Sequence, residues 1–209
     1  MTITSALLSF ALVAGLLTLV PGVDTALILR SAVTRSRAEA LVAALGISTG
    51  VLAWGILAAA GASAVLAASH LAYQVLTYAG AAYLGYLGVS MVVRSLRKQS
   101  AGHVEVKAAG SKARAYTMGF TTNLLNPKIG VFYIAVIPQF TPVGANALLM
   151  GVALAAVHMI LTLVWAGVLV AGASLAGKWL RKPGAVRWMD RITGTVLVGF
   201  GLKVALSRP

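Results

Sequence analysis

Long apolar stretches separated by short polar links dominate this chain. Each stretch is too long and too uniformly hydrophobic for a half-exposed helix, and about 20 apolar residues are enough for a helix to cross a bilayer. The pattern predicts six membrane-spanning helices. By residue number they cover 3–29, 41–68, 71–93, 117–140, 148–175 and 192–206.

The first and fourth spans are each interrupted near their middle, at 20–24 and at 126–128. Each interruption contains a proline and one charged residue, Asp24 in the first and Lys128 in the second. A proline inside a helix has no N–H and leaves the carbonyl four residues earlier without its helical donor. In a bilayer such a carbonyl must be satisfied by protein, ligand or water in a cavity. Paired broken helices, one in each half of a chain, are typical of a transporter's binding site. Structural kinks are the alternative.

Composition places the chain in the membrane. Of its 209 residues 59% are hydrophobic and 10% charged, and the mean hydropathy is +0.91. A soluble domain would have about a quarter of its residues charged. The absence of cysteine excludes disulfides and thiolate metal sites. The net charge of +13 would suggest nucleic-acid binding in a soluble protein, but here the basic residues lie in links, so we expect no nucleic-acid partner.

The basic residues set the orientation. The second and fourth links contain none, and the odd-numbered links contain 14 of the 17. Because basic links stay in the cytoplasm, the sequence predicts a multi-pass protein of the cell (inner) membrane with both termini extracytoplasmic. The 14 are Arg30, Arg35, Arg37, Arg94, Arg97, Lys98, Lys107, Lys112, Arg114, Lys178, Arg181, Lys182, Arg187 and Arg191.

Three spans on each side of a polar segment indicate a repeat. The expected fold is an all-α integral membrane protein whose six helices form two inverted three-helix repeats, with the first and fourth helices broken. The whole chain, 1–209, would be one transmembrane domain. Within it, 1–93 is the first repeat, 94–115 a cytoplasmic linker and 116–209 the second repeat.

Both interruptions should lie near the bilayer centre. Pro21 precedes Arg30 by roughly nine residues and Pro127 follows Arg114 by roughly 13, which is roughly 14 and 20 Å of helix. Asn126 stands where a helix N-cap would be, and proline is favoured directly after it. We therefore expect free N–H groups after Pro127 to be available to an anion.

Several motifs resemble those of one known family, the lysine-exporter superfamily (LysE/RhtB), and within it the homoserine/threonine-exporter branch. The resemblance covers nearly the whole chain. Its one departure is Val23, where the family often has a second proline. It rests on Pro21-Gly22-Val23-Asp24, Tyr78-Ala79-Gly80-Ala81-Ala82-Tyr83-Leu84-Gly85-Tyr86-Leu87-Gly88, Asn123-Leu124-Leu125-Asn126-Pro127-Lys128, Phe132-Tyr133, Pro138-Gln139-Phe140 and Gly194-Thr195-Val196-Leu197-Val198-Gly199-Phe200-Gly201-Leu202.

This resemblance implies a six-helix secondary exporter of amino acids, not an enzyme, driven by proton antiport and assembled as a homodimer. Its acidic residue maps onto Asp24 and its Asn-Pro-Lys motif onto residues 126–128. Neutral substrates of the threonine, homoserine or branched-chain type are favoured, because the spans supply only one deep carboxylate. The alternatives are export of basic amino acids or of a related small metabolite, and a metal-ion permease of the same superfamily.

Residue chemistry favours the same substrate class. A zwitterion needs an acceptor for its ammonium, for which Asp24 and the Leu17 carbonyl are suitable. It also needs a donor for its carboxylate, for which Lys128 and the following N–H groups are suitable. A buried Asp24–Lys128 ion pair that only stabilises the fold is the alternative. The candidate substrate-binding residues are Asp24, Lys128, Asn126, Pro21, Gly22, Pro127, Asn123 and Thr25.

Further candidates could line the cavity or couple protons. His158 titrates in the right range for a proton carrier, although a lone histidine is more often bonded to a neighbouring helix. We expect no cofactor and no metal site, since the three histidines lie in different segments without acidic residues at ligand spacing. This set is Asp24, His158, Tyr133, Trp54 and Trp165.

Overall fold

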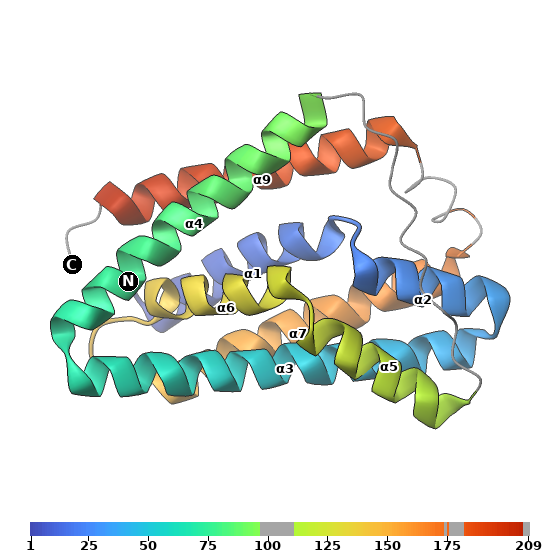
Figure 1. Cartoon of the computed structure of the whole chain (residues 1–209), viewed down its shortest axis with the longest axis horizontal. Helices are drawn as coiled ribbons and strands as arrows, with labels where there is room; N and C mark the ends of the chain where they lie inside the picture. The colour runs from blue at the N-terminus through green and yellow to red at the C-terminus, as the bar shows by residue number, and fades with distance from the viewer. Residues whose placement is uncertain (97–110, 174, 176–181, 207–209) are drawn as a thin grey trace.

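The computed structural model describes residues 1–96, 111–173, 175 and 182–206. The part of the chain that it describes is helical and contains no strand. Its helices are α1 (Ile3–Leu19), α2 (Val23–Thr34), α3 (Arg37–Ala68), α4 (His70–Leu96), α5 (Lys112–Leu124), α6 (Pro127–Phe140), α7 (Ala147–Ala171) and α9 (Pro183–Leu206) (Figure 1).

Most helices begin where a short polar side chain can satisfy a free N–H group. Thr2, Ser36, Ser111 and Asn146 each accept a hydrogen bond from the backbone N–H three residues later, and so cap α1, α3, α5 and α7. The helix α2 differs, because its N-cap is Gly22, which provides no side-chain bond. Local sequence therefore fixes most of the helix starts.

The helices run back and forth between two ends of the molecule. The N-terminus, the end of α3 and the start of α7 lie at one end, while the turn from α2 into α3 lies at the other (Figure 1). The helices α1 and α2 together make one pass, bent by 57° at the break between them. The helices α5 and α6 make another pass, interrupted between Leu124 and Pro127.

Three helices of the described part are long and apolar enough to cross a bilayer, namely α3, α4 and α7. The bent α1–α2 pair provides a fourth span if it is taken as one unit. The helices α5 and α6 have only 13 and 14 residues, and α9 carries Asp190, Arg191 and Lys203. The all-helical membrane fold is thus confirmed, while the prediction of six spans is met in part.

Two predicted boundaries change. The sixth span was expected to be short, at 192–206, but α9 begins at Pro183. The fifth span was expected to reach 175, but α7 ends at Ala171, where Gly172 is its C-cap. Most of the predicted linker 94–115 lies outside the described residues, between the end of α4 at Leu96 and the start of α5.

Glycines allow the closest helix contacts. A Cβ atom on Gly88 of α4 would lie 2.5 Å from the carbonyl oxygen of Gly194 on α9, and the reverse distance is also 2.5 Å. A Cβ on Gly50 of α3 would lie 2.8 Å from Oδ1 of Asn123. In a bilayer the hydrophobic effect does not drive helices together, and small residues let them pack closely instead. Glycine therefore serves packing at these crossings.

Aromatic side chains from several helices fill the core. Phe10 of α1 packs edge-on against Phe140 of α6, with ring centroids 5.5 Å apart, and Phe140 stacks on Phe200 of α9 at 4.5 Å.

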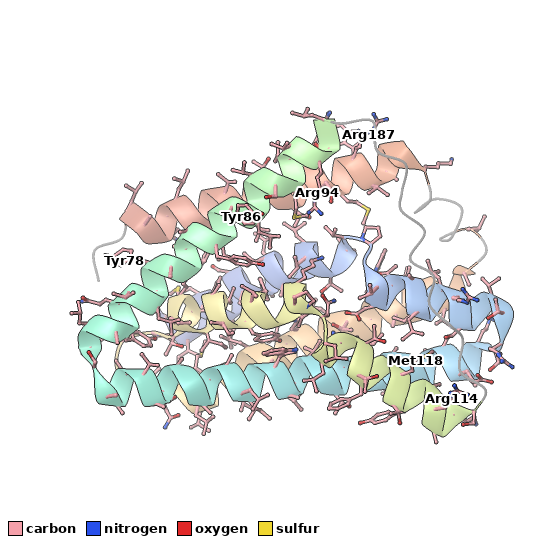
Figure 2. All side chains as sticks on the ribbon, viewed as in Figure 1. Tyr78, Tyr86, Arg94, Arg114, Met118 and Arg187 are labelled. Carbon is pink, nitrogen blue, oxygen red and sulfur yellow. The ribbon has the colours of Figure 1, made fainter. Side chains whose placement is uncertain are left out.

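The outer surface is apolar too. Tyr78 and Tyr86 extend from α4 away from the core, 43% and 68% exposed (Figure 2). Such a surface is suited to lipid rather than water.

Candidate functional site

The first break leaves carbonyls at the end of α1 that other helices satisfy. Pro21 removes the helical donor of Leu17, and the Lys128 ammonium donates to this carbonyl at 3.4 Å. The preceding carbonyl, of Leu16, accepts from the Thr193 hydroxyl of α9 at 3.2 Å. The end of α1 is therefore held by side chains from the second half of the chain.

The second break is closed locally. Asn126 caps α6 as predicted, and its Oδ1 accepts from the Lys128 N–H at 3.1 Å. The next two N–H groups, of Ile129 and Gly130, donate to the Asn126 carbonyl at 3.1 and 3.2 Å. The Leu124 carbonyl accepts from Nε1 of Trp54 at 3.2 Å. The expectation of free N–H groups after Pro127 is therefore wrong, because the Asn126 residue takes all three.

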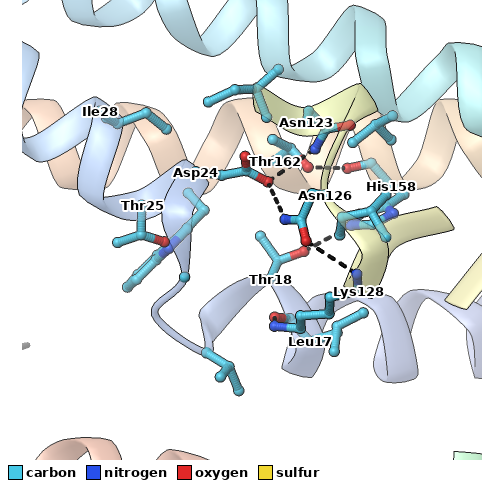
Figure 3. A pocket seen from close by; sticks show the side chains of 16 residues that line it. Leu17, Thr18, Asp24, Thr25, Ile28, Asn123, Asn126, Lys128, His158 and Thr162 are labelled. Carbon is cyan, nitrogen blue, oxygen red and sulfur yellow. Dashed lines mark hydrogen bonds between the residues drawn. The ribbon is translucent and has the colours of Figure 1, made fainter. Parts of the chain in front are cut away.

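A pocket lies between the two breaks (Figure 3). Side chains from α1, α2, α3 and α7 line it together with residues at the α5–α6 junction. It is the place where the two interrupted helices meet. The lining residues are Leu17, Thr18, Val20, Gly22, Asp24, Thr25, Ile28, Ile47, Val51, Asn123, Asn126, Lys128, Ile129, His158, Thr162 and Trp165.

Asp24 faces two asparagine amides across this pocket (Figure 3). Its Oδ2 accepts from Nδ2 of Asn123 at 2.9 Å and from Nδ2 of Asn126 at 3.5 Å. Its Oδ1 is buried with no hydrogen-bond partner, and the same is true of Oδ1 of Asn123. Buried acceptors without donors are costly, on the order of 1–3 kcal/mol each. Oδ1 of Asn123 lies against Gly50 of α3, so Asp24 supplies the unpartnered acceptor that a ligand N–H could satisfy in this pocket.

Lys128 brings positive charge to the same pocket without pairing directly with Asp24. Among the described residues, the ammonium of Lys128 donates to Leu17 and the carboxylate of Asp24 accepts from the asparagines. The two charges attract through space, and Asp190 of α9 attracts Lys128 as well. The ion-pair alternative is thus not realised as a direct contact. An ammonium has three donors, so Lys128 can still bind an anion.

His158 of α7 connects α1 to α6. Its Nε2 lies 3.1 Å from Oγ1 of Thr18 and its Nδ1 lies 3.0 Å from the Tyr133 hydroxyl. Thr18 donates its only hydroxyl proton to the Ala14 carbonyl at 2.7 Å, so it must accept from Nε2. Nε2 of His158 therefore carries a proton, and in the neutral imidazole Nδ1 accepts from the Tyr133 hydroxyl. This arrangement matches the expectation of a histidine bonded to its neighbours.

These contacts suit binding rather than bond chemistry. The pocket offers acceptors on one side, a cation on another and an apolar wall between them. No group of three or more histidine, aspartate or glutamate side chains in the described ranges could hold a metal ion. An arrangement of opposite charges at two helix breaks is a transporter feature.

Comparison with known proteins decides the family. The model of the LysE type translocator family matches residues 6–208. This chain belongs to that family. As a LysE type translocator it is a transporter and not an enzyme.

Three relatives of this LysE type translocator span nearly its full length. The uncharacterized membrane protein YrhP of Bacillus subtilis is 31% identical over 207 residues, 96% of this chain and 99% of the relative. The threonine efflux protein of Salmonella typhi is 30% identical over 90% of this chain and 91% of its own length. The homoserine/homoserine lactone efflux protein of Salmonella typhimurium is 26% identical over 96% of each. No solved structure matches the translocator's sequence significantly.

The fold of the translocator brings most of the predicted site residues together and separates a few. Pro21 and Pro127 form the breaks without lining the pocket. Tyr133 lies behind His158, and Trp54 lies against Gly130, so neither lines it. The predicted residues that do line it are Asp24, Lys128, Asn126, Gly22, Asn123, Thr25, His158 and Trp165.

Sequence reasoning missed several pocket residues. Thr18 could have been identified from the sequence, because it is a polar residue in the last turn before Pro21. Ile28, Ile47 and Val51 carry no signal of their own, because apolar residues are everywhere in such a chain. Asp190 of α9 does not line the pocket, yet its charge attracts Lys128.

Proposed function

We propose that this translocator exports neutral amino acids from the cytoplasm through the pocket between its two helix breaks. The observation that carries the proposal is the Asp24 carboxylate, whose Oδ1 is buried without a hydrogen-bond partner, in a pocket that Lys128 also lines. A carboxylate and a cation in one pocket complement the ammonium and carboxylate of a zwitterion.

In the proposed complex the substrate ammonium donates to Asp24. Asn123 and Asn126 keep the Asp24 carboxylate oriented, and Gly50 leaves the space that Asn123 occupies. The substrate carboxylate accepts from Lys128, whose bond to the Leu17 carbonyl is long at 3.4 Å. Gly22 and Thr25 lie beside Asp24 on the pocket wall, where Gly22 adds no bulk.

Asp24 also provides the simplest route to proton coupling. A carboxylate in the bilayer is stable when neutralised, either by a proton or by the substrate ammonium. If the two compete for Asp24, binding of one on each side of the membrane releases the other, which gives proton antiport. In this scheme His158 connects α1 to α6 through Thr18 and Tyr133 and is not the coupling group.

The proposal includes a cell (inner) membrane location with both termini extracytoplasmic. The excess of basic residues in the odd links supports it, and the start of α1 and the end of α9 lie at the same end of the helices (Figure 1). The contact pattern is that expected of two inverted repeats: α3 packs on α5 and α6, and α7 packs on α1 and α2. A homodimer belongs to the proposal through the family resemblance alone.

The relatives support the substrate class. Two of them are named for threonine efflux and for homoserine/homoserine lactone efflux, and both names describe neutral amino acids or a derivative. Their identity to this chain, 30% and 26%, is a reason to test these substrates first.

Efflux from proteoliposomes tests the proposal. Vesicles containing purified protein are loaded with labelled threonine, valine or lysine, and release is measured with and without an imposed pH gradient. We expect release of the neutral amino acids to exceed that of lysine and to increase with a gradient that drives protons inward. Release equal to that from protein-free vesicles for every amino acid would contradict the export function. Export that ignores the gradient would contradict antiport only.

A further inference from the structure

One tryptophan that lines the pocket has a buried indole N–H without a partner. Trp165 of α7 lines the pocket, and its Nε1 is buried without a hydrogen-bond acceptor. The comparison with Trp54 is informative, because its Nε1 also lies inside the fold but donates to the Leu124 carbonyl at 3.2 Å. A buried donor without an acceptor is unfavourable, so its presence beside a binding pocket indicates a ligand acceptor.

The hydroxyl of Thr162, on the same face of α7, can accept a hydrogen bond where Trp165 can donate one. Thr162 lies three residues before Trp165 and also lines the pocket. It donates its only proton to the His158 carbonyl at 2.8 Å, so toward the pocket it can only accept. One turn of α7 therefore presents a donor, Trp165, and an acceptor, Thr162. A hydroxyl group both accepts and donates, and it would satisfy the two together.

The rest of this wall is apolar. Ile28 of α2 and Ile47 and Val51 of α3 line the pocket together with the α7 pair. Ile28 is buried, 3% exposed, and stands four residues after Asp24, about 6 Å along the helix axis. An amino acid whose ammonium is bound at Asp24 can thus have only a short side chain before that side chain contacts this wall. The space suits a side chain of a few atoms that includes one polar group.

We propose that Trp165 and Thr162 form the side-chain subsite of the translocator, and that they select a short side chain bearing a hydroxyl over an aliphatic one of the same size. This inference rests on the proposed function, because it needs the ammonium to be held at Asp24. Ile28, Ile47 and Val51 contact the methyl or methylene part of the same side chain. Trp165 is then a specificity-determining residue.

Threonine and valine provide the test, since they differ by one hydroxyl in place of a methyl group. Initial efflux of each is measured from loaded proteoliposomes for the wild type, Trp165→Phe and Thr162→Val. We expect the wild type to export threonine about 10-fold faster than valine, because the threonine hydroxyl would accept one hydrogen bond from Trp165 and donate one to Thr162. Each substitution should lower threonine efflux about 3- to 10-fold and leave valine efflux within about 2-fold, so the preference falls.

Trp54→Phe is the matched control. It removes an indole N–H that donates to Leu124 rather than to the pocket, so the threonine-to-valine ratio should stay at the wild-type value even if less protein inserts. An unchanged ratio in Trp165→Phe would overturn the subsite. If that variant does not insert, the wild type alone decides, since equal efflux of threonine and valine overturns it too. Absence of any wild-type efflux would instead contradict the proposed export function.

Discussion

The ammonium of Lys128 lies 3.4 Å from the carbonyl oxygen of Leu17, the group that Pro21 deprives of its helical donor. A side chain from the second half of the chain thus donates to the carbonyl that the break in the first half leaves without its helical donor. The contact also gives Lys128 two tasks, to hold the end of α1 and, in the proposed mechanism, to bind the substrate carboxylate.

Replacing Lys128 should therefore affect stability as well as export. In Lys128→Met the Leu17 carbonyl loses its donor, and we expect a loss of about 1–3 kcal/mol in unfolding free energy together with loss of efflux. Lys128→Gln keeps an N–H donor and should recover part of the stability but none of the transport. Thermal unfolding in detergent and efflux, measured on the same preparations, check this. A Lys128→Gln protein with normal efflux would contradict the role in carboxylate binding.

Asp24→Asn should leave an inserted protein that does not export. The amide occupies the same space and keeps one acceptor for Asn123, but it has no charge for an ammonium. The double variant Asp24→Asn with Lys128→Gln should remain inactive, because no direct ion pair joins the two side chains and none is restored. Membrane abundance and efflux are measured for both singles and the double. Recovery of efflux in the double would favour a purely structural pair.

Gly88→Ala should disrupt the α4–α9 contact. The added methyl would lie 2.5 Å from the Gly194 carbonyl oxygen, and backbone cannot easily move aside at a helix crossing. We expect a marked drop in the amount of folded protein, by roughly 2 kcal/mol of stability. Gly199→Ala on α9 is the control, since a Cβ there meets nothing within 4 Å. Fluorescence-detected size-exclusion chromatography of the two variants compares them, and equal peaks would contradict this packing.

Single cysteines test the proposed orientation, because the chain has none of its own. Thr34 at the end of α2 and Val143 between α6 and α7 are both exposed, Val143 fully at 106%. In intact cells, a membrane-impermeant thiol reagent should label Val143→Cys and spare Thr34→Cys until the membrane is opened. The reverse labelling would place the termini in the cytoplasm.

Much of the candidate site could be predicted from sequence. Asp24, Asn126 and Lys128 stand out because charge, amide and proline are rare inside apolar spans, and the Asn126 cap follows from local rules. The same rules imply that Asn126 takes the N–H groups after Pro127, since an N-cap residue accepts them with its side chain and its carbonyl. The expectation of free N–H groups overlooked this consequence.

Hydropathy and proline act locally, so the order of the residues is enough to establish a helical membrane protein with two interrupted segments. Which distant donors and acceptors meet depends on how the helices pack. Lys128 contacts a carbonyl 111 positions away and Trp54 one 70 positions away, while Trp165 is left without a partner. Both tryptophans follow similar apolar runs, so nothing local separates them. Helix packing places the Leu124 carbonyl beside Trp54 and the pocket beside Trp165.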